Sequence, residues 1–180
     1  MLIAVENTIQ ALQAVVQGLP VGTNFALLQL MWVMLQGRLL TSRGAIFPAL
    51  TGSGLSWRVA RRCWAAMRYG AWESSELIEA WDRYVADQGQ WQEHRHDGYR
   101  GVAVDVTAFW RPRLKGWLGK HFHNVAGRAL PAVSFGVVVR IGQMGLQRVP
   151  LLKSLVRTDP DDPSDTTLMS RLLQQVGQEL

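Results

Sequence analysis

Cys63 is the only cysteine among 180 residues, so the chain lacks the means for a disulfide framework or a cysteine zinc site. A reducing, cytoplasmic compartment is therefore the default expectation. Long apolar runs are also absent: the longest, residues 25–35, is interrupted by Gln29 and is too short to span a bilayer. The first residues have no basic segment and no small-residue cleavage site, which argues against a signal peptide. These absences predict no membrane partner.

Acidic residues are scarce in one part of the chain. The net charge of +5 is made up of zero over residues 1–97, +9 over residues 98–158 and −4 over residues 159–180. The middle block holds ten lysines and arginines and a single acid, Asp105. Such a block is typical of a polyanion-binding surface around an acidic or metal site. A solvated charged face without a ligand is the alternative.

Helical periodicity dominates the first ninety residues. Apolar residues recur at helical spacing, and Ser, Thr or Asn followed by Gly marks several starts and stops. The predicted helices cover residues 6–18, 24–36, 43–50 and 57–69, with another opening at residue 74.

The helix predicted over residues 57–69 has two contrasting faces. Its apolar side consists of Trp57, Ala60, Cys63, Trp64 and Met67, and its basic side of Arg58, Arg61, Arg62 and Arg68. A short helix, a glycine-containing turn over residues 51–54 and a second helix with an arginine face are typical of a helix-turn-helix. We therefore expect these arginines to contact DNA; a basic outer face without a ligand is the alternative.

The periodicity changes to that of strands after a polar linker at residues 91–98. Residues 101–107 predict a strand with Val102, Val104 and Val106 on one face and Asp105 on the other. Residues 109–124 predict a long connection. Further strands are predicted over residues 130–141 and 146–156, separated by a hairpin turn, and a helix begins near Ser164.

Three segments in this part resemble the N-terminal part of DDE-type insertion-sequence transposases, which belong to the RNase H-like superfamily. They are GYRGVAVDVTAFWRP (98–112), GKHFH (119–123) and AGRALPAV (126–133). The resemblance implies an α+β protein with a helical, helix-turn-helix-like DNA-binding region over residues 1–90. Residues 99–180 would then form an incomplete RNase H-like core, a three-stranded antiparallel meander plus one helix.

The resemblance also implies a chemistry. In such transposases three carboxylates hold two divalent metals, usually Mg²⁺, that drive phosphoryl transfer. Asp105 matches the first carboxylate and is the predicted catalytic and metal-binding residue. The second and third would lie on a fourth strand and beyond, past Leu180, so they are expected to have no counterpart in this sequence. Asp159, Asp161, Asp162 and Asp165 are instead explained by helix capping and the helix dipole. A truncated or frameshifted transposase, inactive alone, is therefore expected, and its standing as an enzyme stays open.

Basic residues between the first two strands are the second set of predicted phosphate contacts. They are Arg111, Arg113, Lys115, Lys120, His121 and His123. Trp110 and Trp117 either stack on an unpaired base or pack onto the sheet. Two His-x-His pairs, at 94/96 and 121/123, raise the alternative of zinc, but no cysteine or acid is expected near them, which favours phosphate contact.

The first functional hypothesis is the DNA-binding N-terminal portion of a DDE transposase. It would act in DNA transposition, bind double-stranded DNA at transposon ends and associate with the nucleoid; a homodimer is left open. The alternative is a non-enzymatic DNA-binding or dimerising regulator that competes with a full-length transposase. A third hypothesis is a helical partner-binding protein without DNA contact.

Overall fold

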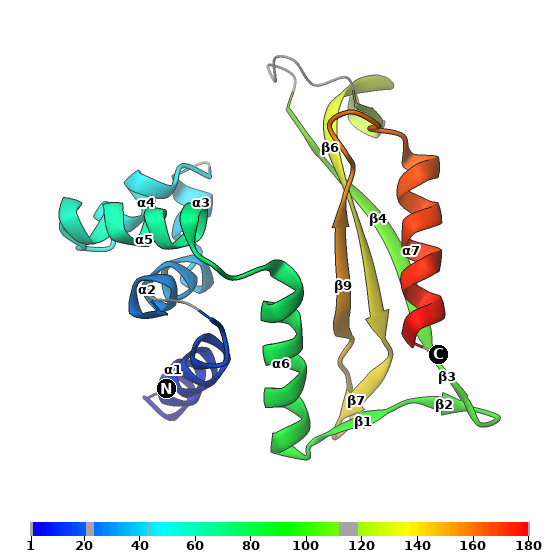
Figure 1. Cartoon of the computed structure of the whole chain (residues 1–180), viewed down its shortest axis with the longest axis horizontal. Helices are drawn as coiled ribbons and strands as arrows, with labels where there is room; N and C mark the ends of the chain where they lie inside the picture. Colours follow the sequence, from blue (N-terminus) through cyan, green and yellow to red (C-terminus); the bar gives the residue numbers. More distant parts are fainter. Residues whose placement is uncertain (1, 21–23, 43, 112–118, 180) are drawn as a thin grey trace. The chain divides into compact units, whose positions relative to one another are not determined.

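The computed structural model describes residues 2–20, 24–42, 44–111 and 119–179, which form an α+β protein with seven α-helices and antiparallel sheets (Figure 1). The chain divides into two compact units, Met1–Tyr84 and Val85–Leu180. The division falls inside one helix, ahead of the boundary predicted after residue 90.

The first unit is helical. It contains α1 (Leu2–Gln17), α2 (Asn24–Leu35), α3 (Arg38–Thr41), α4 (Ile46–Gly52), α5 (Trp57–Tyr69) and the greater part of α6 (Ser74–Gln88). The longer predicted helices are confirmed, the short one begins at Ile46 rather than residue 43, and α3 was not predicted. None of the helices within the described residues is both long and apolar enough to cross a membrane.

Small side chains on α5 pack into the core of this unit. Ala60, Cys63 and Ala66 are buried there together with Leu30 of α2 and Leu50 of α4. Full burial of a leucine such as Leu50, which is 0% exposed, contributes about 1.5–3 kcal/mol.

The apolar face predicted for α5 was wrong at one position. Trp57 is 60% exposed, and Ala66 takes its place in the buried stripe. Trp57 instead packs against α4: the ring centroid of Phe47 lies 4.8 Å from that of Trp57 and 6.1 Å from that of Trp64. Trp57 therefore packs at the rim of the helix pair.

The second unit is built on an antiparallel meander. Strands β4 (Val102–Trp110) and β9 (Leu151–Arg157) both pair with the central β6 (Arg128–Arg140). A further strand, β5 (Lys120–His123), pairs with the first residues of β6 through a 3₁₀ turn, η1 (Asn124–Ala126). The predicted three strands are present, but the predicted long connection contains this fourth one. Its alternation of basic and aromatic residues gave no apolar signal.

The segment 91–98, predicted as a linker, contains short strands and belongs to the second unit. It forms β1 (Trp91–Glu93), which pairs with β7 (Gly142–Met144), and β2 (Arg95–His96), which pairs with β3 (Tyr99–Arg100). Strand β8 (Gln147–Arg148) pairs with β7, so the return strand predicted over 146–156 is divided between β8 and β9. The Trp91 indole Nε1 donates to the carbonyl of Val149 at 2.8 Å, which joins β1 to the residue that follows β8 in the same three-stranded sheet.

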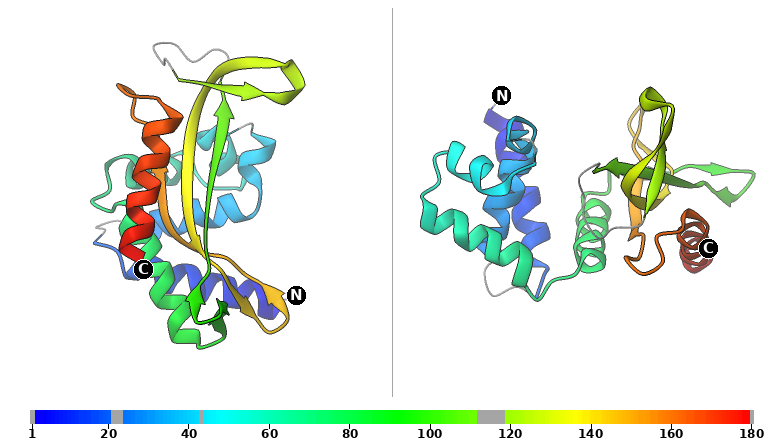
Figure 2. Two further views of the ribbon diagram at one scale, coloured as in Figure 1. Left: turned by 90° about the vertical axis from the view of Figure 1, so that its right-hand side faces the viewer. Right: turned by 90° about the horizontal axis from the view of Figure 1, so that it is seen from above.

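One face of the meander is covered by α7 (Asp165–Glu179), which runs alongside the strands (Figure 2). Val102, Val104 and Val106 pack with Val138 against leucines of this helix, Leu168 and Leu172. The predicted alternation along β4 is confirmed, because Asp105 is exposed on the opposite face. The close approach of α7 depends on Gly136, where a Cβ would overlap the Leu172 side chain.

Candidate nucleic-acid interface

The four arginines of α5 are all exposed, on the side of the helix opposite its buried stripe. Ser56 caps the helix by accepting a hydrogen bond from the Val59 amide at 3.4 Å. The guanidinium of Arg68 lies 5.4 Å from the Trp64 ring centroid. Within the described part of the chain, no carboxylate lies within ion-pair distance of Arg58, Arg61 or Arg62. Their charge is therefore presented to solvent without local neutralisation.

A tight turn and an aromatic cluster set the geometry of α4 and α5. Gly54 adopts a φ of 83°, a backbone conformation that favours glycine, and the contacts of Phe47 hold the two helices together. The predicted short helix, turn and second helix are thus present in this order, with the arginines on the second helix.

Asp105 stands on the open face of the meander. Its Oδ1 accepts a hydrogen bond from the Val106 amide at 2.9 Å, and its register partner on β6 is Val137, which pairs in turn with Leu155 of β9. Its strand neighbours are therefore apolar.

The residues around Asp105 do not fit a two-metal centre. Across residues 2–20, 24–42, 44–111 and 119–179 no group of three or more His, Cys, Asp or Glu side chains could hold a metal ion. One carboxylate alone is insufficient for a pair of Mg²⁺ ions, which are bound through several oxygen ligands.

A second basic region lies at the start of β6. The Arg111 amide donates to the carbonyl of Pro131 at 2.8 Å, and Lys120 is paired in register with the same proline. Both side chains are exposed, so two of the predicted phosphate contacts converge at one end of the sheet. Arg113 and Lys115, together with Trp117, lie outside the described residues.

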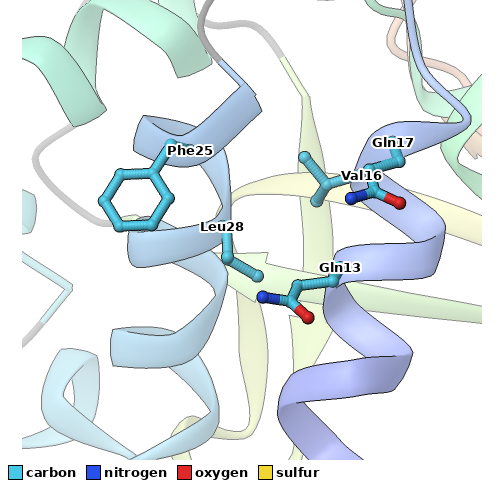
Figure 3. A pocket seen from close by; sticks show the side chains of 5 residues that line it. All are labelled: Gln13, Val16, Gln17, Phe25 and Leu28. Carbon is cyan, nitrogen blue, oxygen red and sulfur yellow. The ribbon is translucent and has the colours of Figure 1, made fainter.

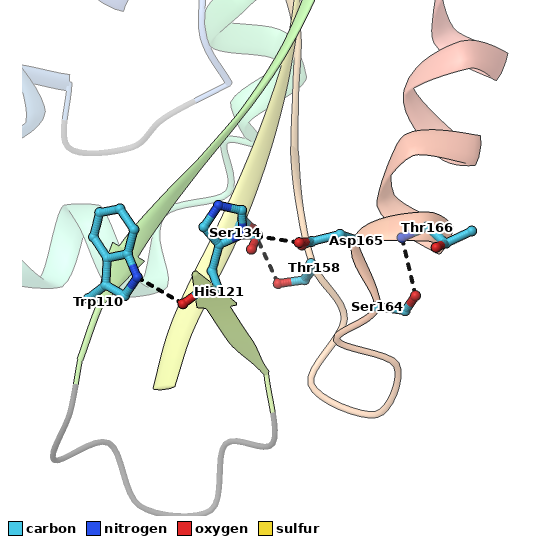
Figure 4. Close-up of polar contacts among 7 residues, drawn as sticks. All are labelled: Trp110, His121, Ser134, Thr158, Ser164, Asp165 and Thr166. Atoms are coloured by element: carbon cyan, nitrogen blue, oxygen red, sulfur yellow. Dashed lines mark hydrogen bonds and ion pairs between the residues drawn. The ribbon is translucent and has the colours of Figure 1, made fainter. Parts of the chain in front are cut away.

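The two histidines of β5 make specific contacts, and Figure 4 shows that of His121. His121 Nδ1 lies 3.0 Å from Oδ2 of Asp165, the first residue of α7. His123 Nδ1 accepts a hydrogen bond from the Ala126 amide at 3.1 Å. The expectation that no acid lies near these histidines was wrong, because the fold brings α7 to β5 over a separation of 44 residues.

Trp110 packs onto this hairpin. Its Nε1 donates to the His121 carbonyl at 3.1 Å, and its ring centroid lies 4.8 Å from that of His123 in an edge-on arrangement. Trp110 therefore packs onto the sheet, which is one of the two alternatives given for it.

The acidic loop before α7 is held by local hydrogen bonds, where capping and the helix dipole were predicted. Asp159 Oδ1 accepts from the Asp161 amide at 2.9 Å, and Asp162 Oδ1 accepts from the Ser164 amide at 3.3 Å. The Thr167 hydroxyl also donates to Asp162, at 2.8 Å. These carboxylates order the entry to the helix.

The sequence analysis did not identify Glu93 as a site residue. Among the described residues it is the acid with the most ion pairs. Its carboxylate lies 2.9 Å from Arg95 Nη2, 3.4 Å from Arg100 Nε and 3.0 Å from Arg140 Nη2, with 15% of the side chain exposed. The spacing of Glu93 and Arg95, two residues apart on an extended segment, was the available signal. This cluster joins the small sheets to the end of β6.

No protein-family model, curated protein or solved structure matches this chain.

Proposed function

We propose that this chain is the DNA-binding N-terminal portion of a DDE transposase that acts in DNA transposition. The observation that carries the proposal is the exposed arginine face of α5, in which Arg58, Arg61 and Arg62 have no acidic partner among the described residues. Unpaired arginines on one helix face suit the phosphates of double-stranded DNA.

The pairing of α4 with α5 supports a helix-turn-helix role. In that arrangement the second helix enters the major groove and its exposed side chains meet base edges and phosphates. Arg68 would join the other three arginines, with its guanidinium pre-positioned by Trp64. The partner we propose is the end of a transposon.

The order of elements in the second unit supports an RNase H-like core. An antiparallel meander of β4, β6 and β9 precedes a helix that covers one face, and Asp105 occupies the first strand. Arg111, Lys120 and the β5 histidines would then lie beside the bound strand, with Arg113 and Lys115 as further proposed contacts.

Asp105 corresponds to a single carboxylate of the proposed centre. Since the described residues bring no cluster of ligands to it, we derive no catalytic step through Mg²⁺ for this chain. The same observation favours a second candidate function, a non-enzymatic DNA-binding regulator that competes with a full-length transposase for the same DNA.

Binding is tested by electrophoretic mobility shift of duplex DNA over a series of salt concentrations. We expect salt-dependent retardation, and replacement of Arg58, Arg61 and Arg62 by Gln should reduce the slope of log K against log salt by up to about 0.9 per lost phosphate contact. Arg83→Gln is the matched control, because Arg83 is an exposed arginine of the same unit paired with Glu79 at 3.9 Å. Retardation that is absent at every salt concentration, or unchanged in the triple variant, would overturn the proposal.

Catalysis is tested separately by nicking of supercoiled plasmid with Mg²⁺. We expect no nicking by the wild-type chain and none by Asp105→Asn. Nicking by the wild type that disappears in Asp105→Asn would instead identify a complete catalytic centre and exclude the regulator.

A further inference from the structure

Two features of the described residues differ in charge. The hollow between α1 and α2 carries none, since it is lined by Gln13, Val16, Gln17, Phe25 and Leu28 (Figure 3). The Glu93 cluster in the second unit, which consists of Glu93, Arg95, Arg100 and Arg140, holds three guanidinium charges against one carboxylate. Its net charge is therefore +2. An uncharged hollow suits any apolar partner, whereas surplus guanidinium charge selects an anion.

Glu93 and Arg140 form the floor of the Glu93 cluster. Their side chains are 15% and 21% exposed, and Glu93 Oε1 lies 3.0 Å from Arg140 Nη2. Arg140 Nε is buried and donates no hydrogen bond within the part of the chain that the structure describes. A buried donor of a charged group is costly to leave without an acceptor. The positive charge of the floor is thus only partly satisfied by Glu93.

Arg95 and Arg100 form the outer layer of the cluster, on the β2–β3 hairpin. They are register partners, so their side chains leave the same face of the hairpin with Cβ atoms about 5 Å apart. Both guanidiniums meet the same oxygen: Glu93 Oε2 lies 2.9 Å from Arg95 Nη2 and 3.4 Å from Arg100 Nε. Like charges directly opposite each other in a sheet repel, and one shared oxygen offsets this repulsion only in part.

The outer edges of these two guanidiniums face solvent. The side chain of Arg95 is 51% exposed and that of Arg100 39%. Arg95 Nη1 donates to the Gly98 carbonyl at 3.3 Å, while the Nη atoms of Arg100 make no hydrogen bond or ion pair with the described residues. Two guanidiniums held side by side present parallel N–H donors, which match the oxygens of one phosphate group.

The turn of the hairpin keeps its one acid away from the arginines. Asp97 (φ 49°) and Gly98 (φ 86°) both have positive φ, as a two-residue type I′ turn requires. Side chains alternate along each strand, so His96 and Tyr99 occupy the face opposite the two arginines. Asp97 Oδ2 lies 3.6 Å from His96 Nε2 and thus belongs to that opposite face. The hairpin projects beyond the meander (Figure 1 and Figure 2), where a large ligand can approach it.

We propose that Arg95 and Arg100 together bind one backbone phosphate of duplex DNA. Glu93 orients both guanidiniums, and Arg140 keeps the net charge of the cluster positive despite this carboxylate. The proposal rests on the DNA partner of the proposed function and adds a contact outside the arginine face of α5. A phosphorylated peptide is disfavoured as the source of the phosphate, because residues 98–158 carry a net charge of +9, which suits a polyanion.

The first test measures duplex DNA retardation over a salt series. Arg95→Gln combined with Arg100→Gln should weaken binding about 10-fold and lower the slope of log K against log salt by about 1, because one phosphate contact is lost. The matched control is Arg171→Gln, an exposed arginine of the same unit whose Nη1 donates to the Arg157 carbonyl at 3.3 Å. Its affinity and its slope should equal those of the wild type.

The second test uses inorganic phosphate alone and therefore does not depend on DNA. Phosphate should raise the thermal midpoint of the wild type by about 2–4 °C relative to chloride at equal ionic strength. The rise should be smaller in the Arg95→Gln/Arg100→Gln variant, since general salt effects on stability are common to both proteins. Equal rises in the two proteins would overturn the phosphate site.

The outcomes separate this site from the proposed function. An unchanged slope in the Arg95→Gln/Arg100→Gln variant, with a lowered slope in the α5 triple variant, would overturn the contact and leave the proposed function standing. Absence of any retardation of the wild type would overturn both. A phosphate-dependent rise without an effect on DNA binding would overturn DNA as the source and identify a site for a small phosphate compound.

A charge-conserving variant covers the case in which the glutamine variant does not fold. Arg95→Lys combined with Arg100→Lys keeps two positive charges beside Glu93 but removes the planar forks of N–H donors. We expect the salt slope of the wild type with about 5-fold weaker binding to duplex DNA. Affinity equal to that of the wild type would contradict the paired guanidinium contact.

Discussion

His121 on β5 and Asp165 at the start of α7 are joined by a contact of 3.0 Å between Nδ1 and Oδ2, across 44 residues of sequence. The contact holds the basic β5 hairpin against the helix that covers the meander. It also explains why His121 is half-buried although it lies in a polar stretch: 30% of its side chain is exposed. The position of the hairpin within its unit is therefore set by a polar contact as well as by strand pairing.

A double-mutant cycle measures this contact. His121→Ala and Asp165→Ala should each reduce the free energy of unfolding, with a coupling between them of about 0.5–1 kcal/mol, because the pair is partly exposed. Urea denaturation of the two single variants and the double variant gives the coupling. Asp161→Ala is the control, since the Asp161 side chain is exposed and does not reach His121. Strictly additive effects would show that the contact contributes no stability.

Gly136 is expected to be intolerant of a side chain. A methyl group there would overlap Leu172, so Gly136→Ala should destabilise the protein by about 1–3 kcal/mol through displacement of α7. Thermal unfolding monitored by circular dichroism measures the change. The matched substitution is Gly177→Ala in α7, where a Cβ meets nothing within 4 Å; it should stabilise by up to about 1 kcal/mol through helix propensity. Equal effects of the two substitutions would contradict the packing argument.

Glu93 is expected to stabilise the second unit. Glu93→Gln removes the charge that pairs with three arginines and leaves the largely buried Arg140 without its ion-pair partner, at a cost of about 1–3 kcal/mol. Glu79→Gln serves as the comparison, because Glu79 and Arg83 are mostly exposed and 3.9 Å apart, and its effect should stay below about 0.5 kcal/mol. Chemical denaturation separates the two, and a Glu93→Gln variant as stable as the wild type would contradict the prediction.

Ionisation of Cys63 is expected to lower the free energy of unfolding at alkaline pH. Burial raises the pKa of this thiol above its ordinary value of 9.0, against the opposing effects of a backbone hydrogen bond and the nearby Arg62 charge. The folded thiol stays protonated at pH values where the unfolded thiol ionises. The contribution of Cys63 to the free energy of unfolding is therefore complete below pH 9.0 and is lost as the pH rises through the raised pKa.

The difference between wild type and Cys63→Ala isolates this effect from other alkaline titrations. The wild type should lose stability more steeply than the variant above pH 9.0, as measured by urea denaturation in a pH series. Parallel pH profiles would show that ionisation of Cys63 is not linked to unfolding.

The predictions that were confirmed rest on regular periodicity of the sequence. The helix at 57–69 was predicted with correct ends, because Ser56 caps it and Gly70 follows it. The outward position of Asp105 was predicted because strand alternation is a local property. Short strands in residues 91–98 and 120–123 were missed, since two to four residues of polar sequence give no periodic signal and their pairing partners lie far along the chain.

The candidate interface could be predicted only in part. The exposure of the α5 arginines follows from the amphipathic pattern of one helix. The partner of His121 and the three arginines around Glu93 could not be predicted, because each contact joins elements that only the folded sheet brings together.

By itself the sequence determined that residues 1–90 are largely helical, that the later part is a meander closed by a helix, and that Asp105 faces away from the core. Local backbone preference and side-chain periodicity are sufficient for such properties. Tertiary structure alone decided which polar side chains meet a partner: Glu93 and His121 do, while Asp105 stands among Val137 and Leu155. The physical reason is that ion pairing depends on distances of a few ångströms between residues that are remote in the sequence.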